Sequence, residues 1–230
     1  MKKSHIAMLL IFLLVIPATL FFDLRLTGRA YYLTSTLVIA EILVPFLLAF
    51  EDRKPQAREL VVLAVLSALA VAARVAIPIP SFKAIFAVIM LSGIAFGPES
   101  GFLVGAVSAF ASNFFYGQGA YTPWQMFAYG FGGFFAGLIF HRHRQWAKPW
   151  LLAPFGFLTI LLIVGPMLDT CTVFTMLTKF TRKNVLAVYA AGVMYNVNHG
   201  IGAALTLLFV SHPLLSKLDR LQTKYGILEI

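Results

Sequence analysis

Charged side chains are scarce in this sequence, and the shortage excludes an ordinary soluble domain. Only 12% of the 230 residues are Asp, Glu, Lys or Arg, whereas 60% are hydrophobic. A soluble domain carries roughly 25% charged residues to cover its surface. The composition therefore predicts a protein that lies within a lipid bilayer.

Cysteine and acidic residues are also few. The single cysteine, Cys171, excludes an internal disulfide. The formal net charge is +9, but the basic residues stand in short clusters between apolar runs. Such clusters are typical of cytoplasmic loops that face anionic lipid, and we expect membrane lipid rather than nucleic acid as the partner.

Catalytic and nucleotide-binding motifs are missing. The sequence has no G-x-S-x-G elbow, no H-E-x-x-H pair and no phosphate-binding P-loop. We expect no metal and no cofactor, and any active transport would take its energy from another chain. An intramembrane enzyme that uses Asp169 and His199 stays open as an alternative, as does a structural membrane protein.

The apolar runs predict an all-α, polytopic transmembrane helix bundle, because a spanning helix needs roughly 20 mostly apolar residues. The run after Lys2 and Lys3 resembles a signal peptide, but its length favours an uncleaved first span. Gly97 and Pro98 predict a tight turn between two short helices. The expected spans are residues 5–22, 30–50, 59–77, 84–97, 101–116, 124–140, 150–168 and 185–210.

The polar linker at residues 51–58 divides the chain. We expect an accessory N-terminal hairpin and linker at 1–57, a six-helix core at 58–211 and a cytoplasmic amphipathic tail at 212–230. In the tail, one helical face carries Leu214, Leu215, Leu218 and Leu221. It suits an interfacial helix or, alternatively, a helix that docks on a partner.

The positive charges predict the orientation. Basic clusters precede the first expected span and follow the second, sixth and last ones, so both termini of a multi-pass cell-membrane protein would be cytoplasmic. The rule holds by majority, since the expected outer loops also contain basic residues: Arg25, Arg29, Lys83, Lys179, Arg182 and Lys183.

Small residues recur at four-residue spacing. Ala64, Ala68 and Ala72 share one face of the third expected span. Such a face lets helices approach closely in lipid, and it suits either packing within the bundle or an external helical partner. Glycine faces, for which internal packing is the stronger expectation, occur at Gly101, Gly105, Gly130, Gly133 and Gly137.

The richest polar stretch joins the fifth and sixth spans, at residues 112–125. Amide side chains next to aromatic ones suit a ligand pocket, although the aromatic residues alone would fit an interfacial belt. The candidate substrate-binding residues here are Asn113, Tyr116, Gln118, Tyr121, Trp124 and Gln125.

Polar side chains inside two later spans extend the candidate site. Asp169 follows a long apolar run, and Tyr195, Asn196 and His199 lie in the last span. Polar groups in hydrocarbon are costly unless paired, and they mark function by default. The alternatives are a helix end that reaches the headgroups, for Asp169, and an interhelical hydrogen-bond network for the others.

These segments together resemble the substrate-binding (S) components of energy-coupling factor (ECF) vitamin transporters, over about residues 58–226. The matching motifs are Ala64-x-x-x-Ala68, the turn at 93–101, Ser112-Asn-Phe-Phe-Tyr-Gly-Gln-Gly119, Thr122-Pro-Trp-Gln-Met126 and Pro213-Leu-Leu…Lys224-Tyr-Gly226. The first 57 residues lie outside the resemblance.

The resemblance implies a six-helix core that binds a vitamin at the extracellular side and has no enzymatic activity. It implies that Ala64 and Ala68 dock on a transmembrane coupling (T) subunit, and that two cytoplasmic ATPase chains supply the energy. The pattern in residues 113–125 most resembles cobalamin-type members, while riboflavin and a queuosine precursor stay open as substrates.

Overall fold

The protein is described here by a computed structural model that places residues 10–15, 18–19, 31–52, 54–76, 79 and 82–226. Most of the expected first span at 5–22 lies outside the described residues. The helices, in chain order, are η1 (Ile11–Val15), α3 (Tyr31–Glu51), α4 (Ala57–Val75), α5 (Ile85–Phe96), α6 (Pro98–Tyr116), α7 (Thr122–Phe140), η2 (Arg144–Trp146), α8 (Pro149–Thr159), η3 (Ile160–Val164), α9 (Gly165–Met176) and α10 (Arg182–Tyr225).

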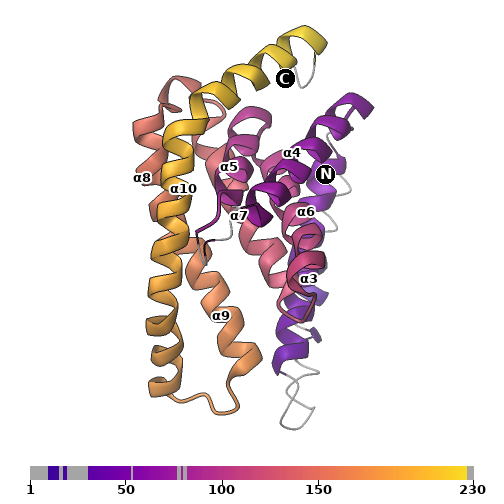
Figure 1. The fold of residues 1–230 in the computed structure, drawn as a ribbon. Helices are drawn as coiled ribbons and strands as arrows, with labels where there is room; N and C mark the ends of the chain where they lie inside the picture. The colour runs from indigo at the N-terminus through magenta and orange to yellow at the C-terminus, as the bar shows by residue number, and fades with distance from the viewer. Residues whose placement is uncertain are drawn as a thin grey trace.

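The all-α prediction is confirmed over the placed residues, where every regular element is a helix. The helices run roughly along one axis (Figure 1). The end with the turns at 117–121 and 177–181 is called the loop end, and the end with the C-terminal turns of α10 is called the tail end. Among the described helices, Pro149–Met176 and Arg182–Tyr225 are each long and apolar enough to cross a membrane.

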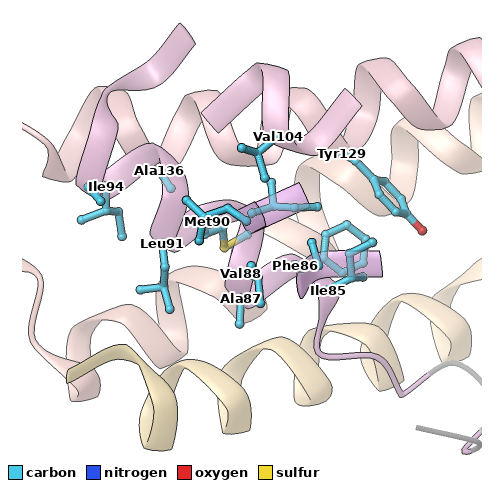
Figure 2. Packing of buried hydrophobic residues seen from close by; sticks show 14 of the residues in the cluster. Ile85, Phe86, Ala87, Val88, Met90, Leu91, Ile94, Val104, Tyr129 and Ala136 are labelled. Carbon is cyan, nitrogen blue, oxygen red and sulfur yellow. The ribbon is translucent and has the colours of Figure 1, made fainter. Parts of the chain in front are cut away.

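Helix α5 is the centre of the bundle. It has 12 residues and all of them are buried, so it spans about 18 Å, well short of a bilayer core of roughly 30 Å. Figure 2 shows its side chains pointing to several sides, with Val104, Tyr129 and Ala136 of neighbouring helices around them. A short, almost wholly apolar helix is stable here because other helices, rather than lipid, surround it.

The tight turn expected at Gly97-Pro98 is present. Gly97 has a positive φ of 95°, which a glycine adopts without strain, and Pro98 starts α6. Helices α5 and α6 are therefore separated by one residue and pack as a hairpin, with α7 against both.

Glycines form the contact between α5, α6 and α7. A Cβ added at Gly133 would overlap the backbone carbonyl of Gly101, and one added at Gly101 would lie 2.6 Å from the carbonyl oxygen of Gly133. The backbones touch, as in other small-residue helix contacts in membranes. This contact, called the glycine seam, contains Gly93, Gly101, Gly105, Gly130, Gly133 and Gly137.

The alanine face, made of Ala64, Ala68 and Ala72 on α4, has the opposite surroundings. All three residues are exposed, and so are the flanking Val61 (63%) and Val65 (61%). The opposite side of α4 packs on the bundle through residues such as Leu63, Leu66 and Ala70. Within the placed part of the chain, this face is therefore not packed inside the bundle.

The last helix runs further than its apolar run predicted. The expected span ended at residue 210, but α10 continues to Tyr225 with Pro213 inside it. Figure 1 shows its last turns leaning across the tail end. Proline removes a backbone hydrogen bond and bends a helix without having to end it. The boundary proposed between core and tail, at 211 and 212, thus lies inside one helix.

The C-terminal turns are fastened to the bundle. Leu215 and Leu218, on the apolar face proposed for an interfacial helix, are buried in the core cluster. The Gln222 side-chain amide donates to the carbonyl of Ala95 at 2.9 Å, and Arg144 pairs with Asp219. Part of this face is therefore covered by the protein itself rather than by the membrane surface.

Candidate functional site

Two adjoining hollows lie among the helices toward the loop end. The first has a volume of about 360 Å³ between α5, η3, α9 and α10, and the second has about 350 Å³ between α4, α6, α7 and α9. Leu168 and Thr172 line both. Each volume is within the range of roughly 300–1,000 Å³ that is usual for small-molecule sites.

The first hollow is mainly apolar, with one polar side. Phe86, Ile160 and Val164 supply apolar walls. The polar side comes from Asp169 on α9 and Asn196 and His199 on α10. An apolar cavity with a few convergent polar groups is the usual form of a small-molecule site.

Asp169 and Asn196 form one polar unit. The Asn196 side-chain amide donates to the carboxylate of Asp169 at 2.8 Å. Two glycines make room for this pair, because a Cβ on Gly165 would overlap Asn196 and a Cβ on Gly192 would overlap the Asp169 carboxylate. The carboxylate keeps further acceptor capacity for a ligand.

A π-helical turn, η3, precedes this unit. It occupies Ile160–Val164 between α8 and α9 and makes Pro149–Met176 one continuous helical stretch. π-turns often occur at functional sites, because the extra residue re-aims the side chains that follow. The expected span ended at residue 168, so Asp169 was predicted close to a helix end. It lies instead well inside a helix.

The second hollow is organised by Arg74, which is not among the predicted site residues. Its guanidinium donates to the Asn113 side-chain oxygen at 3.0 Å and to Ser112 Oγ. It also lies over the Tyr116 ring, 4.8 Å from the centroid, in the range of a cation–π contact. The available signal was a cation inside an expected span, which marks a functional residue by default.

Asn113 is the hub of this second group. It is wholly buried on α6, and its amide donates to Gln125 Oε1 at 2.8 Å and to Thr122 Oγ1 at 3.4 Å. With Arg74 on its oxygen, each polar atom of the side chain has a partner. Asn113 therefore fixes the positions of Arg74 and Gln125 as well as lining the hollow.

The predicted site residues fall into three groups. The second hollow brings together Asn113, Tyr116, Tyr121 and Gln125, and the first brings together Asp169, Tyr195, Asn196 and His199. Gln118 and Trp124 line neither. The residues that line the hollows but were not among the predicted site residues include Arg74, Phe86, Thr172, Thr175 and Gly192.

Gln118 and Trp124 have other surroundings. Gln118 is exposed, and its amide donates to the carbonyl of Phe110 while its oxygen accepts from Thr122, so it shapes the turn after α6. Trp124 is 8% exposed and packs with Ile39 and Cys171. It became part of the apolar packing because α3 covers this side of α7.

The arrangement does not make a catalytic dyad of Asp169 and His199. Both line the first hollow, but Asp169 bonds to Asn196 while the His199 ring pairs with the carbonyl of Tyr195 at 2.9 Å. The one thiol, Cys171, belongs to an apolar cluster with Ile39 and Trp124 and lines the second hollow rather than the first. No set of three His, Cys, Asp or Glu side chains in the placed part of the chain is grouped to hold a metal ion.

Comparison with known families gives one finding. The family described as "ECF-type riboflavin transporter, S component" matches residues 54–218. No curated protein and no solved structure matches the chain. The matched segment contains α4 to α9 and most of α10, and both hollows lie within it.

Proposed function

Because the chain belongs to the family of ECF-type riboflavin transporter S components, we propose that it captures a vitamin at the loop end and delivers it by docking on a separate coupling subunit. An S component is the substrate-specificity subunit of an ECF transporter and is not an enzyme. The observation that carries the proposal is the pair of adjoining hollows with polar groups from α4, α6, α7, α9 and α10.

The size of the hollows supports a ligand of flavin size. Each of the two adjoining hollows has about 350–360 Å³, and together they stay within the usual range of roughly 300–1,000 Å³ for small-molecule sites. A corrin with its nucleotide loop is several times bulkier than a flavin ring system. Riboflavin is therefore the proposed ligand, and cobalamin, whose type of S component the motifs in residues 113–125 most resemble, is the competitor to test.

The chemistry of the hollows supports the same choice. Riboflavin has a flat, largely apolar ring system with donors and acceptors at one edge, and a chain of hydroxyls. The first hollow offers Phe86 as an apolar wall and Asp169 and Asn196 as edge partners. The second offers Arg74 and Gln125, which suit hydroxyls.

Docking is assigned to the alanine face. Ala64, Ala68 and Ala72 are exposed along α4, and small side chains let a partner helix approach the backbone closely in lipid. The proposed partner is the transmembrane coupling subunit, and two separate cytoplasmic ATPase chains would drive transport.

The proposed orientation places the loop end outside the cell. The tail end carries the basic residues Lys54, Arg58, Arg142, Arg144, Lys148, Lys217, Arg220 and Lys224. Positive charge favours the cytoplasmic side, so the tail end and both termini would be cytoplasmic. The hollows would then open toward the vitamin supply.

Ligand titration tests the proposal. The purified full chain is titrated with riboflavin, followed by the quenching of flavin fluorescence, and separately with cobalamin. We expect riboflavin to bind with a Kd below about 1 μM, which corresponds to roughly 8 kcal/mol, and cobalamin to bind more weakly than about 1 mM. Tight cobalamin binding without riboflavin binding would reverse the assignment, and no binding of either vitamin would overturn the choice of ligand class.

A further inference from the structure

Helix α3 lies outside the family match but packs along the matched core. The match begins at residue 54, whereas α3 ends at Glu51 and contacts α6, α7 and α9. Phe46 stacks on Phe102 of α6 at 4.1 Å between ring centroids, and it meets Phe134 of α7 edge-on at 5.3 Å. The additional helix is thus anchored to the core in its C-terminal third.

Toward the loop end, α3 lies behind the second hollow. Ile39 is 6% exposed and belongs to a cluster with Trp124 and Cys171, against which Tyr121 packs. Tyr121 and Cys171 also line the second hollow, from the α6–α7 turn and from α9. Helix α3 therefore packs, through Ile39, in a cluster with Tyr121 and Cys171, two residues that line the second hollow.

A hydrogen bond ties α3 to the turn itself. Thr36 Oγ1 donates to the carbonyl oxygen of Ala120 at 3.0 Å. Ala120 stands between Gly119 and Tyr121, in the turn that leads into Thr122 and Gln125. A glycine-containing turn has more backbone freedom than the helices beside it, so a bond from a fixed helix restricts where the turn can lie.

We propose that α3 positions the vitamin site, and that Thr36 is its positioning residue. The Thr36–Ala120 bond and the Ile39 cluster hold the α6–α7 turn at a fixed separation from α9. Tyr121 and Gln125 on one side and Thr172 and Thr175 on the other then face each other across the second hollow. The expected effect on vitamin binding rests on the proposed function. The expected effect on the position of the turn does not.

The test compares Thr36→Val, which removes the hydroxyl and keeps the volume, with Thr36→Ser, which restores a donor. The matched control is Thr206→Val, because the Thr206 hydroxyl donates within α10 to the carbonyl of Gly202 at 2.7 Å and neither residue lines the hollows. Each full-length variant is studied by riboflavin titration, by the riboflavin dissociation rate and by the thermal midpoint without ligand.

We expect Thr36→Val to weaken riboflavin binding about three- to tenfold, the usual effect of one hydrogen bond, mainly through faster dissociation. Thr36→Ser should restore most of the affinity, and Thr206→Val should change it less than twofold. A lowered thermal midpoint with unchanged affinity would show a merely structural bond and would overturn the proposal. So would a loss of affinity that Thr36→Ser does not restore.

Hydrogen exchange of the ligand-free protein tests the positioning without any vitamin. The amides of Gly119 and Thr122 bond within the turn, to Thr122 Oγ1 and to the Gly119 carbonyl. In Thr36→Val the peptide that contains residues 117–122 should exchange several times faster, and in Thr206→Val at the normal rate. Equal exchange in both variants would overturn the inference even if riboflavin binds. Faster exchange in a protein that binds neither vitamin would refute only the proposed ligand.

Discussion

The glycine seam and the alanine face both consist of small residues that recur three or four positions apart on helices. In the seam, backbone touches backbone, so that a Cβ at Gly105 would lie 2.5 Å from the carbonyl oxygen of Tyr129. On the alanine face, Ala64, Ala68 and Ala72 are all exposed. Similar spacing therefore closes the bundle in one place and leaves an exposed face in the other.

The spacing of small residues defines a helix face but not what packs against it. Glycines are needed where two backbones of one chain meet, because even a methyl group does not fit. Alanine suffices where a helix needs only a smooth surface, and it keeps the helix propensity that glycine lacks. The residue type, as well as the spacing, separates the two uses.

The largest expected effect comes from filling the seam. Gly133→Ala should prevent folding or lower stability by more than about 3 kcal/mol, beyond the usual cost of overpacking, because the new Cβ overlaps the backbone of Gly101. The thermal midpoint and the yield of monodisperse protein measure the effect.

The neighbouring glycine gives the control. In Gly132→Ala the Cβ would meet Val164 Cγ2 at an ordinary 3.4 Å, so this variant should stay within about 1 kcal/mol of wild type. If Gly133→Ala were as stable as Gly132→Ala, the close backbone contact between Gly101 and Gly133 would not exist in the protein.

The second effect concerns docking. Changing both Ala64 and Ala68 to Trp should lower vitamin uptake by cells at least about tenfold, because bulky rings keep a partner helix away from α4. Riboflavin affinity of the purified variant should not change. Ala190→Trp, at an exposed alanine of α10 that lines neither hollow, should leave uptake normal. Retained uptake in the double variant would remove the alanine face as the docking surface.

The third effect tests a glycine that faces a side chain rather than a backbone. In Gly192→Ala the Cβ meets the Asp169 carboxylate, which can rotate away. The fold should persist with a loss of about 1 kcal/mol, while riboflavin binding weakens about tenfold because Asp169 and Asn196 separate. Thermal unfolding and titration of the same sample distinguish the two results, and unchanged affinity would contradict the role given to this pair.

The smallest effect is expected on the alanine face itself. Ala68→Gly keeps the surface small, so uptake should stay within about twofold of wild type. Stability should fall by only about 0.5–1 kcal/mol, the cost of glycine in a helix interior. A large loss of uptake here would mean that the partner contacts the methyl group rather than the space around it.

Much of the fold was predictable from the sequence because its causes are local. Apolar runs gave the helices from α3 to α10, and Gly97 with Pro98 gave the hairpin between α5 and α6. The ends of the helices were less predictable. Asp169 and Pro213 looked like ends, but in each case the helix continues, because packing against neighbouring helices outweighs one unfavourable residue.

The candidate site was predictable in composition but not in arrangement. Eight of the ten predicted site residues line the two hollows, since polar groups in apolar segments are rare and therefore conspicuous. Arg74 was missed, although it joins Asn113 and Tyr116. Its role depends on which helices lie next to α4, and the sequence does not state that.

By itself, then, the sequence determined that this protein is a helical membrane protein with two kinds of small-residue face. Hydropathy and residue spacing act within single helices, and they can be read along the chain. Only the tertiary structure decided that the glycine faces meet each other, that the alanine face stays exposed and that α3 packs against Trp124 and Cys171. These outcomes depend on contacts between residues far apart in sequence, and the fit of the surfaces decides which of those contacts form.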